Sequence, residues 1–103
     1  MLFRSNGLTF SDLCEKYSID YIDFLQIDTE GFDSQIILSI DFDKVKIKKI
    51  KYEYWPFDRD QYVNYGEEAN KYGQDGIELV EDKLSSLGYK LFYYSEDVVA
   101  TLR

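Results

Sequence analysis

The residues whose types and spacing could carry chemistry are two carboxylates and a glycine that follow an apolar run. The run spans residues 21–27, and Asp28, Glu30 and Gly31 come directly after it. A third carboxylate, Glu53, stands near the end of the next apolar run. Because ligands of α/β proteins bind at the carboxyl ends of parallel strands, we expect Asp28, Glu30 and Glu53 to share one acidic corner as candidate catalytic residues.

Two kinds of chemistry suit such a corner. Carboxylates held close together repel one another, which raises the pKa of one of them toward neutrality and fits it for proton transfer. Alternatively, a hard cation such as Mg²⁺ could neutralise them through oxygen ligands, although we assign no metal site. A purely structural role is also open, and the spacing alone favours it. In that role Asp28 caps the next helix, Glu30 offsets its dipole and Gly31 gives the backbone clearance.

The elements that must position this corner follow from periodicity. Residues 21–27 carry apolar side chains on both faces, which predicts a strand covered by helices on both sides. Thr9 and Asp12 form a capping pair for a helix ending near Ser18. A second helix is expected over residues 31–40, where Asp33 in its first turn suits the helix dipole. A second strand is expected over residues 45–55, where it ends before Pro56.

The remainder of the chain predicts one more helix and a hairpin. The last helix begins at Asp75 and stops at Gly88. Strands over residues 89–94 and 98–102 are close enough to pair antiparallel. Residues 1–8 read as a loose start, and residues 57–74 as either a lid or a plain connection. The alternation of strands and helices predicts an α/β fold with two parallel strands, crossover helices and a terminal antiparallel hairpin.

Composition narrows the range of partners. A chain of 103 residues allows one domain, and its net charge of −8 disfavours nucleic acid and anionic membranes. The exception is residues 44–51, with five lysines, which are expected to form a solvated face rather than a phosphate-binding patch. Cys14 is the only cysteine and is expected to be a small core residue. The chain has no histidine, which excludes His-based triads, and a reducing cytoplasm is the expected location.

Four segments, in this order, resemble FkbM-type S-adenosylmethionine-dependent methyltransferases. The central one is the hydrophobic strand that closes on Asp28 and continues as Thr29-Glu30-Gly31-Phe32. The helix lead-in at residues 9–13, the strand at residues 51–54 and the helix-to-strand turn at residues 87–91 agree with it. The resemblance covers roughly residues 8–102 and only the C-terminal half of the family's domain.

The resemblance implies a fold, a cofactor and a reaction. The fold would be the C-terminal half of a Rossmann-like methyltransferase sheet, with residues 1–103 as one partial domain. The donor would be S-adenosylmethionine, and the acceptor a hydroxyl-bearing metabolite or sugar methylated on oxygen. Asp28 and Glu30 would face the donor pocket and orient the acceptor or take its proton, with Glu53 nearby.

One departure from the family pattern matters. No strand here is followed by the Gly-rich turn that holds such a cofactor, and no acidic residue is placed to hold its ribose. We therefore expect the N-terminal cofactor-binding half to be absent and the chain to bind S-adenosylmethionine poorly, without activity by itself. The edge of the strand at residues 21–27 would then lack a neighbour, which favours self-association.

Another function class stays open. A small acidic α/β domain could act as a non-catalytic binding module that holds a partner chain through its open sheet edge or through the tyrosine-rich residues 62–72. A mimic of nucleic acid has only the net charge in its favour.

Overall fold

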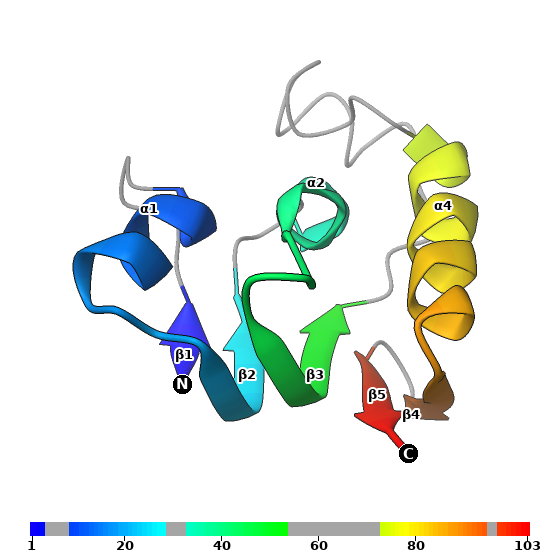
Figure 1. The fold of residues 1–103 in the computed structure, drawn as a ribbon. Coiled ribbons are helices and arrows are strands. Elements are labelled where there is room, and N and C mark those ends of the chain that lie inside the picture. The colour runs from blue at the N-terminus through cyan, green and yellow to red at the C-terminus, as the bar shows by residue number, and fades with distance from the viewer. Residues whose placement is uncertain (4–8, 29–32, 54–72, 95–96) are drawn as a thin grey trace.

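In the part of the chain that the structure describes, three helices pack on one mixed, five-stranded sheet (Figure 1). The computed structural model describes residues 1–3, 9–28, 33–53, 73–94 and 97–103. The strands are β1 (Leu2–Phe3), β2 (Tyr21–Ile27), β3 (Lys46–Glu53), β4 (Tyr89–Tyr94) and β5 (Asp97–Leu102), in the sheet order β1-β2-β3-β5-β4. The helices are α1 (Phe10–Lys16), α2 (Asp33–Ser39) and α4 (Gly73–Ser86).

The pairing of the strands confirms the predicted α/β order. β2 and β3 are parallel neighbours, with Tyr21 beside Lys46 and Gln26 beside Lys51. β5 runs antiparallel between β3 and β4, so the terminal hairpin adds one reversed strand inside the sheet. Buried and exposed side chains alternate along β2 and β3, except that each strand has two consecutive exposed residues, at 23–24 and 48–49. Because these two irregular positions lie opposite each other, the pairing of β2 with β3 has the same register before and after them.

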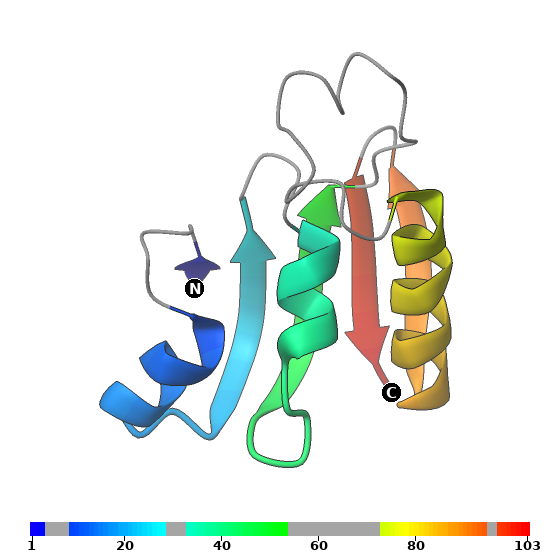
Figure 2. The same cartoon turned by 90° about the horizontal axis from the view of Figure 1, so that it is seen from above.

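All three helices lie on the same face of the sheet, as the two views show (Figure 2). The prediction that residues 21–27 are covered on both faces is therefore wrong: Asp23 and Phe24 are exposed. The reason is topological. Each crossover moves in the same direction across the sheet, and right-handed crossovers in one direction place their helices on one side.

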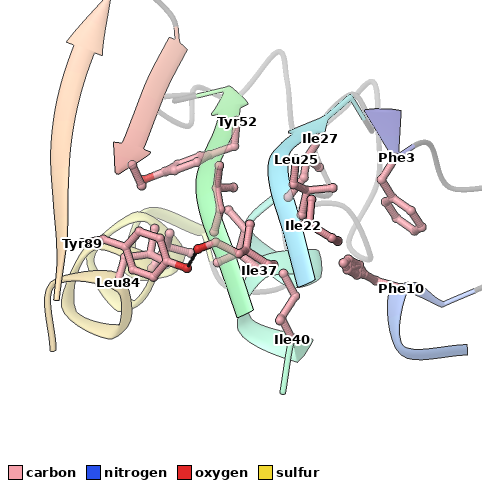
Figure 3. Close-up of a cluster of buried hydrophobic side chains, with 14 of the residues drawn as sticks. Phe3, Phe10, Ile22, Leu25, Ile27, Ile37, Ile40, Tyr52, Leu84 and Tyr89 are labelled. Atoms are coloured by element: carbon pink, nitrogen blue, oxygen red, sulfur yellow. Dashed lines mark hydrogen bonds between the residues drawn. The ribbon is translucent and has the colours of Figure 1, made fainter. Parts of the chain in front are cut away.

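The core fills the space between the sheet and this helix layer (Figure 3). Its largest fully buried side chains come from β2, β3, β5 and all three helices, and include Leu25, Ile47, Ile50, Val98, Phe10, Ile37 and Leu84. Cys14 packs against this cluster, as expected. Burial raises the pKa of its thiol above the usual value.

The predicted caps at Thr9 and Gly88 agree with the helix ends, whereas α4 begins at Gly73 and not at Asp75 as predicted. The Thr9 side chain accepts a hydrogen bond of 3.0 Å from the Asp12 amide and so caps α1, as predicted. Gly88 adopts a φ of 96° after α4, a left-handed conformation that favours glycine at a helix end. Within the described part of the chain, no helix is long and apolar enough to span a membrane.

The start of the chain is not loose, contrary to expectation. Leu2 and Phe3 form β1, parallel to the carboxyl half of β2. The amide of Gln26 donates to the Met1 carbonyl over 2.7 Å, and the amide of Asp28 donates to the Phe3 carbonyl over 3.0 Å. This strand forms because the ring of Phe3 is buried against Phe10, with their centroids 5.5 Å apart. The segment 54–72, including most of the proposed lid, lies outside the described residues.

Candidate functional site

Asp28 and Glu53 lie together at the carboxyl edge of the sheet, as predicted. Asp28 follows β2 directly and Glu53 is the last residue of β3, and the register of the two strands sets them side by side. Both line a hollow of about 200 Å³. Glu30 lies outside the described residues. The catalytic role of these three carboxylates stays a prediction.

Side chains from three strands complete the hollow. Gln26 comes from β2, Lys51 and Tyr52 from β3, and Asp97 from the start of β5. Sequence reasoning missed Lys51 and Asp97. Lys51 is one of the five lysines predicted to form a solvated face, and Asp97 falls between the two strands predicted for the terminal hairpin. Lys51 stands two residues before Glu53 on β3 and therefore shares its side of the strand. The pairing of β3 with β5, which places Glu53 opposite Asp97, brings Asp97 to the corner.

Lys51 is the positive charge in this acidic corner. Its Nζ lies 3.8 Å from Oδ2 of Asp97, and both side chains are more than one third exposed. Such a solvated ion pair adds little to stability. Its effect is local, because a cation that lines this hollow offsets part of the negative charge of the carboxylates that line it too.

Asp33 stabilises the acidic corner through a hydrogen bond to the main chain of Glu53. Its side chain is only 4% exposed, and its Oδ2 accepts a hydrogen bond of 2.9 Å from the Glu53 amide. Since Asp33 opens α2 and Glu53 ends β3, this bond fixes the start of the helix to the end of the strand. Sequence analysis gave Asp33 only an electrostatic role in the first helical turn. The clue was an acidic residue directly after a strand-to-helix turn.

The hollow at the acidic corner is by itself too small for S-adenosylmethionine. Sites for molecules of that size measure roughly 300–1,000 Å³, which exceeds the volume of this hollow. Among the described residues there is also no group of three or more metal-ligating side chains close enough to hold an ion.

A larger cavity of about 420 Å³ lies at the opposite edge of the sheet. It is lined mainly by apolar side chains between α1 and the segments that lead into β2 and β3, among them Phe10, Cys14, Ile19, Ile40 and Val45. Its size does not make it the functional site, because the carboxylates gather at the other edge, where ligands of α/β proteins bind.

Comparison with known proteins agrees with this geometry. The methyltransferase FkbM domain matches residues 5–91, which is most of the chain and includes Asp28, Glu30 and Glu53. Comparisons with curated proteins and with solved structures gave no match. The resemblance in the sequence is thereby confirmed, and the chain belongs to the methyltransferase FkbM domain family.

Proposed function

We propose that this chain is the C-terminal part of an S-adenosylmethionine-dependent methyltransferase that methylates an oxygen of a hydroxyl-bearing metabolite or sugar. The observation that carries the proposal is the meeting of Asp28 and Glu53 at one hollow within the region that matches the family. In this proposal Asp28, Glu30 and Glu53 serve the acceptor side of the reaction.

The chain's own residues bind and orient the acceptor. A carboxylate at Asp28 or Glu30 accepts a hydrogen bond from the acceptor hydroxyl and can take its proton, and holding the reactants in place supplies much of the acceleration. Glu53 is fixed through its amide by Asp33, so the base of the corner does not shift. Lys51 balances the negative charge around the acceptor.

The fold supports a partial domain. The parallel pair β2 and β3 with their crossover helices corresponds, in this proposal, to the second half of a Rossmann-like methyltransferase sheet. In this proposal the chain lacks the cofactor-binding half of the domain. The small volume of the hollow and the lack of a Gly-rich turn in the sequence support this. The chain by itself should therefore bind S-adenosylmethionine weakly and turn over no substrate.

Calorimetry with S-adenosylmethionine tests the partial-domain proposal. We expect no binding at micromolar concentrations of the cofactor to the chain. Micromolar affinity would contradict the partial-domain proposal.

The catalytic roles of the carboxylates can be tested only in a form of the polypeptide that shows turnover. There, Asp28→Asn and Glu30→Gln should each lower kcat by at least about 100-fold, the usual contribution of a general base. Asp43→Asn, an exposed change at the opposite edge, is the matched control. Unchanged turnover in the first two variants would remove their role.

One observation favours the alternative of a non-catalytic binding module. β1 covers only the carboxyl half of β2, so on that side no described strand pairs with residues 21–23. A partner strand could add there and satisfy the edge. Two results together would favour this function over methyl transfer. The chain would capture such a partner, and no longer polypeptide that contains the chain would show turnover.

A further inference from the structure

The face of the sheet opposite the helices is a surface that the methyltransferase proposal uses only at its end near Glu53 (Figures 1 and 2). We call it the open face. Its side chains alternate with the buried ones, and the strand register places them in two rows across the sheet. The rows are Phe24–Lys49–Thr101–Lys90 and Leu2–Gln26–Lys51–Val99–Phe92.

The open face is basic on a chain whose net charge is −8. It carries Lys46, Lys48, Lys49, Lys51 and Lys90, against Asp23, Glu53 and Asp97. All three carboxylates already have partners: Asp97 lies beside Lys51, Asp23 accepts a hydrogen bond from Tyr21, and Glu53 has an interaction of its own.

A strip of positive charge therefore runs along β3. Lys46, Lys48 and Lys49 are all exposed, and within the described residues no carboxylate forms an ion pair with any of them. We call these three residues the basic strip. Three neighbouring lysines without counter-ions repel one another, so a partner that supplies carboxylates gains favourable electrostatic energy there.

Apolar side chains flank the basic strip on both sides. Phe24 on β2 and Phe92 on β4 are each 39% exposed, and Leu2 on β1 is 50% exposed. The Nζ of Lys90 lies 5.4 Å from the centroid of the Phe92 ring, which shows that both share this face. An exposed apolar area with charged residues beside it is typical of an interaction surface.

We propose that the open face docks an amphipathic helix of a partner protein, whose contact face carries a line of carboxylates with apolar residues beside them. A helix suits a sheet face because its own backbone groups are already paired, whereas an added strand binds at an edge. The spacing also fits. Lys46 and Lys49 are about 10 Å apart along a strand, and positions i and i+7 of a helix are about 10.5 Å apart.

Two other occupants fit the charges less well. A second copy docked face to face would set one basic strip against another, and like charges in contact oppose binding. A nucleic acid would meet the basic strip favourably, but the net charge of −8 repels a polyanion at longer range. A short helix brings few charges and also covers Phe24 and Phe92.

A titration followed by NMR tests the docking. The probe is a synthetic 18-residue amphipathic helix with leucines on its contact face and glutamates at positions i, i+4 and i+7 beside them. Its matched control has glutamine in place of each glutamate. We expect the glutamate peptide to shift the amide signals of Phe24, Lys49 and Val99. It should bind at least about tenfold more tightly than the glutamine peptide, which corresponds to 1.4 kcal/mol.

Paired protein variants locate the contact. Lys49→Glu should weaken binding of the glutamate peptide at least about tenfold, a loss of 1.4 kcal/mol. Lys44→Glu makes the same charge change in the turn before β3, off the open face, and should leave the affinity within about twofold. Equal affinity of the two peptides, or signal shifts confined to α2 and α4, would overturn the proposal. So would a dimer in light scattering that Lys49→Glu dissociates, or an oligonucleotide that produces the same shifts more strongly.

Discussion

At the scale of single residues, the buried phenol of Tyr89 makes the stability of the fold depend on pH. The Tyr89 hydroxyl donates to the main-chain carbonyl of Ile47, and the side chain is 6% exposed (Figure 3). Burial raises the pKa of Tyr89 to about 12, because the charged phenolate is poorly solvated there. In the unfolded chain the pKa is about 10. The stability that this residue contributes is therefore complete below pH 10 and is lost as the pH rises through 12.

Replacing Tyr89 by Phe should remove this pH dependence. We expect Tyr89→Phe to lower the free energy of unfolding by about 1 kcal/mol at pH 7, the usual value of one hydrogen bond. Between pH 10 and 12 the native chain should lose roughly 2 kcal/mol more than the variant. Urea denaturation at a series of pH values measures both. Tyr94→Phe, at a residue 60% exposed, is the control and should follow the native chain. Parallel curves for Tyr89→Phe and the native chain would contradict the assignment.

Asp33 gives a second prediction at this scale. Its carboxylate accepts the Glu53 amide and has other interactions in its buried position. Asp33→Ala leaves that amide without its acceptor and should lower the free energy of unfolding by about 1–3 kcal/mol. Hydrogen exchange should show faster exchange at the Glu53 amide, with the middle of β3 little changed. Asp43→Ala, at an exposed turn position, controls for the loss of one carboxylate. Unchanged protection of Glu53 would show that the bond does not hold the corner.

At the scale of elements, α2 is held at its carboxyl end by a residue far away in sequence. The Nζ of Lys83, on α4, donates to the carbonyls of Ile37, Leu38 and Ile40 over 3.0–3.2 Å. It also lies 5.1 Å from the centroid of the Phe42 ring. Desolvation lowers the pKa of this ammonium, while the charge of Asp41 opposes the shift. A single cation therefore serves the last carbonyls of a helix that has no basic residue in its own last turn.

Removing that cation should loosen α2. We expect Lys83→Met, which keeps the length of the side chain, to lower the free energy of unfolding by about 1–3 kcal/mol, because three carbonyls lose a charged donor. Amide exchange in α2 should rise more than exchange in β3. Lys44→Met, an exposed position, is the matched control and should change stability by less than about 0.5 kcal/mol. A loss as small as that of the control would show that water replaces the ammonium.

The elements also show what the sequence could and could not predict. The strands β2, β3, β4 and β5 and the caps at Thr9 and Gly88 follow from local pattern, and the structure confirms them. β1 could not be predicted, because two residues carry no periodicity and pair only through contacts with a strand 24 residues away. Asp28 and Glu53 are predictable as neighbours because each ends one of two parallel strands. Asp97 and Asp33 reach the same corner through contacts between segments far apart in the sequence, which no local spacing encodes.

At the scale of the whole molecule, the sheet is covered unevenly. One face has its helix layer, the other is open, and β1 covers only part of the β2 edge. The Met1 ammonium donates to the Phe24 carbonyl over 2.6 Å, so the chain start satisfies the edge from Phe24 to Asp28. Unsatisfied strand edges promote pairing between chains. Opposing this, a net charge of −8 keeps copies apart at low ionic strength.

Deleting residues 1–3 should therefore turn β2 into a fully open edge and promote self-association. Phe3→Ala is the matched control, because it removes the buried ring but keeps the main-chain hydrogen bonds of β1. Both variants should lose stability, by roughly 3–5 kcal/mol for the ring alone. Only the deletion should raise the mass measured by light scattering. Raising the salt concentration to about 0.5 M should increase the effect, because it screens the repulsion between acidic copies. If Phe3→Ala associates as strongly as the deletion, exposed core surface rather than the bare strand edge drives association. If neither variant associates, the covering of this edge by β1 has no part in preventing association between chains.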